Sequence, residues 1–315
     1  MNRGNRFNAD MVQHPDLTDG LPEGLLARPL TLDDAQAVTD VMAAEEMAVL
    51  GEVVIEYADI VGDWQRPSFD ITASTIGVFA GDALVGYAER SGHTRGDAAV
   101  HPDHQGRGIG TWLAGWLQET ARAAGDDVIG MPKPEGSPGD RLLESLGFRV
   151  RWNSWVLQLP EGAAIPSRPL PPGYAVRTAT PDEHEAVWTV VEDAFLEWSV
   201  RPRQTFEDFA ASVFRRPGFE PWNLRVATDP EGAVVGVSIV VLASGCAYVD
   251  KLAVRRDQRK QGLATALLAD SFAISREHGA TRSELSTDSR TGALGLYAGV
   301  GMQVTSNWVN RAIDV

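Results

Sequence analysis

The pattern of hydrophobic and polar positions changes twice between residues 247 and 280. Apolar residues dominate from Ala247 to Val254, as in a buried strand. Residues 255–261 are charged or polar. After Gly262, apolar positions recur every three to four residues, at Leu263, Ala266, Leu267 and Phe272. This spacing is typical of an amphipathic helix. The stretch therefore predicts a strand, a basic turn and a helix that begins at a glycine.

The same arrangement occurs earlier in the chain. Val100 and Val254, Gly108 and Gly262, and Gly147 and Gly301 are each separated by 154 positions. A constant separation across three landmarks indicates two copies of one unit, aligned without gaps in this region. Capping-box patterns at 31–34 and 180–183 predict that each copy has a first helix with the same kind of start. Trp155 and Trp308 occupy matching places near the end of each copy.

The remaining pattern predicts the other elements of each copy. For the first copy these are strands over 25–29, 75–80, 83–90, 98–100 and 127–129, and helices over 31–50, 54–64 and 108–124. Residues 131–139 contain three prolines and two glycines, which predict an irregular loop. For the second copy the pattern predicts strands over 174–177, 224–228, 234–242 and 304–313, and helices over 181–196 and 206–214.

These elements predict an α+β fold in two tandem domains, each a mixed, mostly antiparallel sheet flanked by helices. We expect a loose leader over 1–22, an N-terminal domain over 23–160, a linker rich in proline and glycine over 161–173, and a C-terminal domain over 174–315.

Composition narrows the classes of function. The formal net charge of −15 argues against a nucleic-acid partner, because phosphate binding requires a basic face. The charge either attracts a cationic amine substrate or only keeps the protein soluble. No apolar run is long enough to span a membrane, and the first residues lack a signal-peptide core. The single cysteine, Cys246, fits a reducing compartment and a role in the core. We therefore expect a cytoplasmic protein with no membrane partner, and no metal site, because the six histidines are scattered.

The turn before Gly262 can bind an anion. The N-terminus of a helix presents free backbone N–H groups and a partial positive charge, and glycine lets a phosphate approach closely. Arg259 and Lys260 add charge beside it. A solvated basic turn is the alternative explanation of the same residues.

Two motifs together carry a family resemblance. Val254-x4-Arg259-x2-Gly262-x-Ala264 resembles the acyl-CoA loop of the GNAT family of N-acetyltransferases, and Val100 to Gly110 is a version closer to the family pattern. Ala293-x2-Leu296-Tyr297-x3-Gly301-Met302 resembles that family's tyrosine-bearing helix.

The resemblance implies that acetyl-CoA is the cofactor, and it implies which residues bind it. In the C-terminal copy these are Leu252, Ala253, Val254, Arg259, Lys260, Gln261, Gly262, Leu263, Ala264 and Arg290. In the N-terminal copy they are Val100, Gln105, Gly106, Arg107, Gly108, Ile109 and Gly110. Arg290 stands where many relatives carry an asparagine, so Arg290 or Ser289 is expected to take over that contact.

The resemblance also implies the chemistry, which is direct attack of an amine on acetyl-CoA in a ternary complex. Tyr297 resembles the family's tyrosine that faces the sulfur of coenzyme A, although a tyrosine in the core would fit the same helix. Asp250 is the leading candidate for the base. Period-two alternation places it on the same strand face as Tyr248, Leu252 and Val254. Glu284, Asp288 and solvent remain alternatives.

The two copies are not expected to be equivalent. Leu143 replaces the tyrosine in the N-terminal copy, so we expect that copy to be degenerate and the C-terminal copy to be catalytic. The expected acceptor is a primary amine of a small molecule or peptide. The alternative function is an acyl-CoA-binding scaffold or regulator without turnover, and a homodimer is possible. A P-loop nucleotide-binding protein is excluded, because neither turn contains Gly-x4-Gly-Lys-Ser/Thr.

Overall fold

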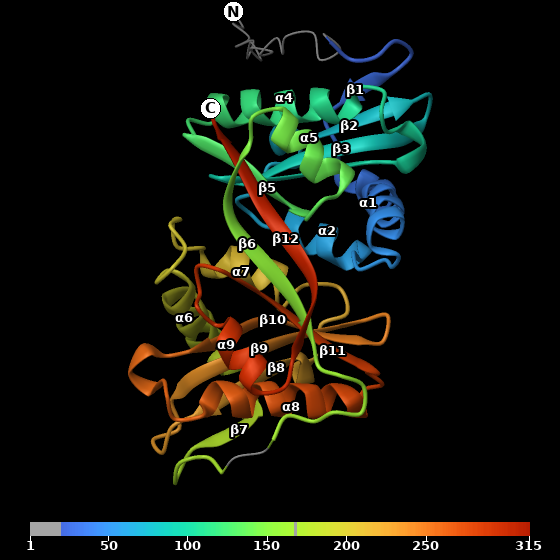
Figure 1. Cartoon of the computed structure of the whole chain (residues 1–315). Coiled ribbons are helices and arrows are strands. Elements are labelled where there is room, and N and C mark those ends of the chain that lie inside the picture. The colour runs from blue at the N-terminus through green and yellow to red at the C-terminus, as the bar shows by residue number, and fades with distance from the viewer. Residues whose placement is uncertain (1–19, 167–168) are drawn as a thin grey trace, which may run out of the picture.

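The computed structural model describes residues 20–166 and 169–315, so most of the predicted leader and part of the predicted linker lie outside the described residues. Within these ranges twelve strands form one mixed sheet, in the order β1-β2-β3-β4-β5-β12-β6-β11-β10-β9-β8-β7. Figure 1 shows the N-terminal half above the C-terminal half, with helices on both faces of the sheet. The predicted α+β class is confirmed.

The N-terminal half follows the predicted order of elements. Its strands are β1 (Leu26–Arg28), β2 (Thr75–Ala80), β3 (Ala83–Gly92), β4 (Arg95–Val100), β5 (Val128–Pro134) and β6 (Arg149–Gln158). Its helices are α1 (Ala35–Leu50), α2 (Tyr57–Trp64), α3 (Ile71–Ser74), α4 (Ile109–Ala123) and α5 (Pro138–Ser145). Thr31 begins the first helical segment with the predicted capping box.

The C-terminal half repeats this order. Its strands are β7 (Ala175–Thr178), β8 (Leu224–Thr228), β9 (Val234–Ala243), β10 (Cys246–Val254), β11 (Arg282–Asp288) and β12 (Gln303–Asp314). Its helices are α6 (His184–Phe195), α7 (Phe206–Ser212), α8 (Leu263–Glu277) and α9 (Leu294–Gly299). Cys246 is buried in β10, where burial raises the pKa of its thiol to about 11, so it acts as a core residue.

The prediction of an irregular loop over 131–139 is wrong. β5 continues through Pro132 and Pro134, and α5 begins at Pro138. The backbone N–H of Gly130 points toward β4 and that of Glu135 points toward β12, so by alternation both proline nitrogens face β4. β4 pairs with β5 only through Arg95 and Gly130. The two prolines therefore remove no hydrogen bond from the sheet, which is why the strand tolerates them.

Alternating side chains of the strands pack into cores on opposite faces of the sheet. On one face, α1 and α2 cover Phe79, Leu84 and Tyr87, and α6 and α7 cover the corresponding strands of the second half. On the other face, α4 and α5 pack on a core that includes Val85 and Val100, and α8 and α9 pack on the equivalent core. Each half therefore has helices on both faces of its strands.

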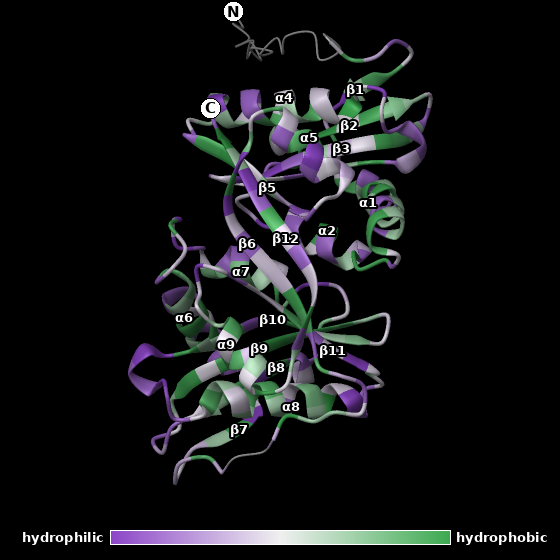
Figure 2. Ribbon diagram, in the orientation of Figure 1, coloured by the Kyte–Doolittle hydropathy of each residue, from purple (hydrophilic) through white to green (hydrophobic). Residues whose placement is uncertain are grey.

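The last strand of each copy joins the other half. β6 pairs with β11 over Ser154 to Gln158 and also with β12, whereas β12 pairs with β5 over Trp308 to Asp314. Figure 1 shows β6 and β12 running side by side between the halves. In Figure 2 these crossing strands include hydrophilic segments between the halves. The two halves therefore complete each other's sheets.

Polar contacts between α2 and the region of α7 also join the halves. Arg216 lies 2.8 Å from Glu56 Oε2 and 2.8 Å from Asp59 Oδ1, and its side chain is largely buried. The Gln65 amide donates to the carbonyl oxygens of Ala211 and Arg215. Removing both carboxylates would be costly, because it would leave the largely buried Arg216 charge uncompensated.

We predict that the chain unfolds in a single transition, because neither half has a complete sheet without the strand of the other. Urea unfolding followed by far-ultraviolet circular dichroism and by tryptophan fluorescence is expected to give coincident curves. Two separated transitions would show that the halves are stable independently of the exchanged strands.

Candidate functional site

A cleft of about 1760 Å³ lies between the two halves. Its walls come from β6, β10, β11 and β12, from the end of α1, from the β3–β4 hairpin, from the segment after α6 and from the loop before α8. Typical sites for one small ligand measure about 300–1,000 Å³. The cleft is therefore large enough to hold two substrates at the same time.

One end of the cleft contains the predicted anion loop. Gly262 is the N-cap of α8, with φ 86°, and Gly108 is the N-cap of α4, with φ 90°. Both are left-handed conformations that glycine adopts without strain. No atom lies within 4 Å of the position that a Cβ on Gly262 would take. The N–H groups of the first turn of α8, from Leu263 onward, have no acceptor within the helix and face this opening.

The two loops differ at one strained position. Lys260 has a positive φ of 65° where the N-terminal copy has Gly106, with φ 74°. A lysine rarely adopts this conformation, and such backbone strain is concentrated at functional sites. Lys260 and its neighbour Gln261 are exposed at the rim, where they can reach an anion.

Arg259 holds the loop together. Its Nε donates to the carbonyl oxygen of Val254 at 3.0 Å. In the N-terminal copy Gln105 makes the corresponding bond to Val100, at 3.1 Å. The other two nitrogens of Arg259 pair with Glu197, at 2.5 and 2.9 Å. Arg259 therefore connects the anion loop to the segment after α6.

The groove beside the loop is formed by two strands that separate. β10 and β11 pair over Cys246 to Val249 and diverge beyond that point. Because the N–H of Arg255 bonds to β9, alternation directs the backbone groups of Leu252 and Val254 away from β9 and toward the gap. Ala253 points its side chain into the core under α6. The gap can therefore pair with an extended chain that carries amide groups.

The prediction that Leu252 and Val254 share a strand face with Tyr248 and Asp250 is wrong. The register of β10 against β9 shifts between Val249 and Lys251, so Asp250 is the extra residue of a β-bulge. Beyond the bulge the alternation reverses, and Leu252 and Val254 no longer share a face with Tyr248. The Asp250 carboxylate lines the cleft, is 39% exposed and lies 2.5 Å from the Lys251 ammonium.

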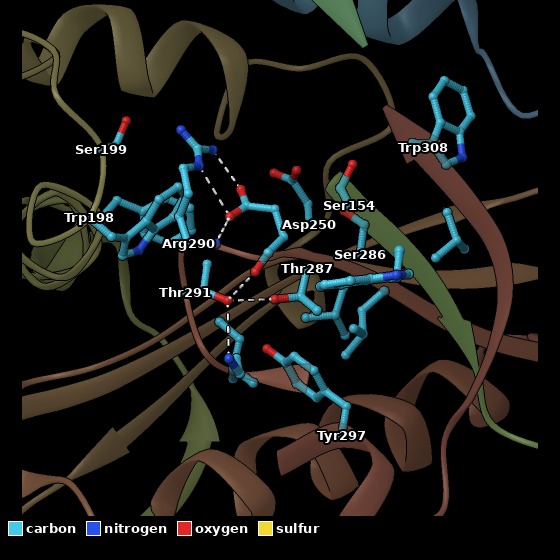
Figure 3. Close-up of a pocket in the computed structure, with 18 of the residues that line it drawn as sticks. Ser154, Trp198, Ser199, Asp250, Ser286, Thr287, Arg290, Thr291, Tyr297 and Trp308 are labelled. Atoms are coloured by element: carbon cyan, nitrogen blue, oxygen red, sulfur yellow. Dashed lines mark hydrogen bonds and ion pairs between the residues drawn. The ribbon is translucent and has the colours of Figure 1, made fainter. Parts of the chain in front are cut away.

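Tyr297 lies on α9, at the edge of the cleft and packed against the core of the C-terminal half. Figure 3 shows its hydroxyl directed toward Thr287 and Thr291. Burial raises the pKa of the phenol to about 12, so it remains protonated at neutral pH. In the N-terminal copy Leu143 of α5 occupies the corresponding place and is buried.

A second carboxylate lies on the cleft wall. Glu284 of β11 is nearly buried, and burial raises its pKa, although Arg282 at 2.9 Å partly opposes this shift. A raised pKa suits a general base, because the group is then a stronger proton acceptor when ionised. Asp288, the other candidate on β11, is instead paired with Arg290 at 2.5 Å.

Arg290 is held between two aromatic rings. Its guanidinium lies 3.6 Å from the ring centroid of Trp152 and 4.9 Å from that of Trp198. Figure 3 shows this group beside Trp198. Trp152 comes from β6 of the N-terminal copy, and Trp198 follows α6. No spacing in the sequence indicates this contact, because it depends on the strand exchange.

Among the described residues, no group of three or more His, Cys, Asp or Glu side chains is placed to hold a metal ion. No helix within 20–166 and 169–315 combines the length and apolar character needed to cross a membrane.

Comparison with known proteins matches both halves of the chain. The acetyltransferase (GNAT) family matches residues 184–302, and the FR47-like proteins match residues 84–156. A mycothiol acetyltransferase of Salinispora arenicola is 31% identical over 266 residues, which cover 79% of this chain and 82% of that protein.

Solved structures show the same fold. A GCN5-related N-acetyltransferase of Sphaerobacter thermophilus superposes with a TM-score of 0.71 at 27% identity, covering 93% of this chain and 96% of that one. A tandem GNAT protein of the clavulanic acid biosynthesis pathway superposes with a TM-score of 0.69 at 20% identity, covering 92% and 98%.

We predict that Glu197→Gln tightens the binding of acetyl-CoA, because Glu197 competes with phosphate for the guanidinium of Arg259. The expected gain is about two- to fivefold in Kd, as for one partly exposed charge pair. Calorimetric titration measures it, and Glu185→Gln, an exposed change on the preceding helix α6, is the control. An unchanged or weaker affinity for Glu197→Gln would show that Arg259 does not contact the phosphates.

Proposed function

Because the chain belongs to the GNAT family of acetyltransferases, in tandem form, we propose that its C-terminal copy transfers the acetyl group of acetyl-CoA to the amine of a small molecule or peptide. The protein is an acyltransferase, and its cofactor is acetyl-CoA. The proposal concerns which copy works, which residues act and which acceptor is used.

The arrangement of three features along one groove carries this proposal. The anion loop at Gly262 is open, the gap between β10 and β11 presents the unpaired backbone groups of Leu252, and the Tyr297 hydroxyl lies at the edge of the cleft. Acetyl-CoA has phosphates, an amide-bearing arm and a thioester, in that order. The order of the three features matches the order of these chemical groups.

Bound acetyl-CoA supplies an activated acetyl group and a thiolate leaving group. The Tyr297 phenol, protonated because its pKa is about 12, can donate a hydrogen bond or a proton at the sulfur. The first-turn N–H groups of α8 hold the phosphates without needing to reorganise. The size of the cleft allows the acceptor to be present at the same time, which supports direct transfer.

The attacking amine must lose a proton, and two carboxylates on the cleft wall can accept it. Glu284 combines a raised pKa with a position beside the point where β10 and β11 separate. Asp250 is closer to solvent and paired with Lys251. We therefore favour Glu284, directly or through water, over the base predicted from the sequence.

The acceptor site is proposed to lie across the two halves. Ser154 and Trp152 come from β6, Glu46 comes from α1, and Trp198 follows α6, and all of them line the cleft. The relative from Salinispora arenicola is named for acetylation of a small molecule, which supports an acceptor of that class. A scaffold that binds acyl-CoA without turnover is the competing function, and release of coenzyme A in the presence of amines separates the two.

We predict that Gly262→Glu abolishes the binding of acetyl-CoA, because the side chain adds bulk and negative charge at the phosphate position. Calorimetric titration tests this on the native protein, on Gly262→Glu and on the matched Gly108→Glu, with the last expected to bind like wild type. If binding is lost only in Gly108→Glu, acetyl-CoA binds the N-terminal copy, and the proposed C-terminal site is wrong.

We predict that Tyr297→Phe lowers kcat by roughly 10²-fold with little change in KM for acetyl-CoA, because the hydroxyl acts on the leaving group and not on binding. The assay follows release of coenzyme A with a thiol reagent across a panel of primary amines. Tyr57→Phe, an exposed change on α2, is the control. If Tyr297→Phe keeps full kcat, Tyr297 is a core residue and not the acid.

A further inference from the structure

The residue that faces the strand gap differs between the two copies. By the separation of 154 positions, Lys133 of β5 corresponds to Thr287 of β11, and Ala98 of β4 corresponds to Leu252 of β10. β4 and β5 pair only through Arg95 and Gly130, so they separate as β10 and β11 do. The N-terminal half therefore has a gap of the same origin.

The side chain of Lys133 crosses this gap. Its Nζ lies 2.5 Å from the carbonyl oxygen of Ala98 and 3.1 Å from Oε2 of Glu45 on α1. Only 10% of the side chain is exposed. Helix α5 packs on it, since a Cβ on Gly139 would lie 3.1 Å from Lys133 Cδ. Burial alone lowers the pKa of Lys133, but the carboxylates of Glu45, Asp97 and Glu46 outweigh burial and raise it, so the amine is charged.

On the β5 side of the gap, opposite Ala98, the backbone has lost two hydrogen-bond donors. Pro132 and Pro134, whose nitrogens face the gap, correspond to Ser286 and Asp288 of β11. Proline has no N–H to donate. An extended amide chain would therefore find no donor at these positions of β5, and would find the Ala98 carbonyl already bonded to Lys133.

The anion loop of the N-terminal copy, in contrast, is intact. Gly108 has nearly the same left-handed conformation as Gly262, and Gly106 to Gly108 are exposed. The two phosphate loops share the left-handed N-cap glycine. They differ in that Lys260 replaces Gly106, and in that Pro22 lies 3.6 Å from the position of a Cβ on Gly108. The larger difference between the copies is in the groove.

We infer that Lys133 decides which copy binds acetyl-CoA. In the N-terminal copy its ammonium occupies the strand gap and bonds the Ala98 carbonyl, whereas in the C-terminal copy the amide-bearing arm of acetyl-CoA occupies the corresponding gap beside Leu252. Each chain therefore binds one cofactor. This inference rests on the proposed cofactor groove of the C-terminal copy and is independent of the proposed amine acceptor. The N-terminal copy thus contains a second groove that its own lysine keeps closed.

The test is the number of acetyl-CoA molecules bound per chain, measured by calorimetry. Wild type is expected to bind one, and Lys133→Thr, which introduces the residue of the C-terminal copy, is expected to bind two. Adding Gly108→Glu to Lys133→Thr should return the number to one, because it blocks only the opened site. Thermal denaturation of each variant establishes that it is folded.

A reciprocal variant keeps the test decisive if Lys133→Thr does not fold. Glu45 lies as many residues after the capping box of Thr31 as Ala194 lies after that of Thr180, so Ala194 of α6 corresponds to Glu45 of α1. Ala194 lines the cleft. Ala194→Glu/Thr287→Lys therefore recreates the lysine pair in the C-terminal copy and is expected to lose acetyl-CoA binding. Ala194→Glu alone is the control for the added charge.

Each outcome bears on one proposal. Two molecules bound to wild type, one bound to a folded Lys133→Thr, or retained binding in Ala194→Glu/Thr287→Lys would overturn the role of Lys133. No binding to wild type would overturn the proposed cofactor groove itself. Failure to acetylate any amine, with these binding numbers intact, would overturn the proposed transfer to an amine and leave the role of Lys133 standing.

Discussion

The exchange of last strands between the two copies is the constraint on which the rest of the molecule depends. β6 lies between β11 and β12, and β12 lies between β5 and β6, so the sheet continues across both halves. Backbone hydrogen bonds within a sheet are hard to replace once they are buried. The exchange therefore fixes the position of each half, and with it the walls of the cleft.

The groove follows from a second backbone feature, the divergence of β10 and β11. Parallel strands that separate leave N–H and C=O groups without partners, and such groups must find water or a ligand. The bulge at Asp250 lies at the point of separation and reverses the sheet face to which the following side chains point. A single extra residue thus decides which side chains face the core and which backbone groups face the groove.

In the N-terminal half the strands diverge in the same way, but the chain itself satisfies or removes the backbone groups at the gap. Lys133 satisfies the carbonyl of Ala98 from within the chain, and two prolines remove donors from the opposite strand. A buried ammonium is tolerated there because Glu45 pairs with it. The chain thus contains two similar scaffolds, and we propose that small changes at the strand gap separated their roles.

The sequence by itself determined the duplication, the order of elements, the α+β fold, the glycine-bearing loops at Gly108 and Gly262 and the placement of Tyr297 on a helix. These features depend on local periodicity and on spacing, which a linear pattern preserves. Only the tertiary structure decided the strand exchange, the bulge at Asp250 that reverses the faces of Leu252 and Val254, the stacking of Arg290 on Trp152 and the closure of the first groove by Lys133. Each of these depends on which distant strands pair and in which register, and a one-residue shift in register reverses the face of every side chain that follows.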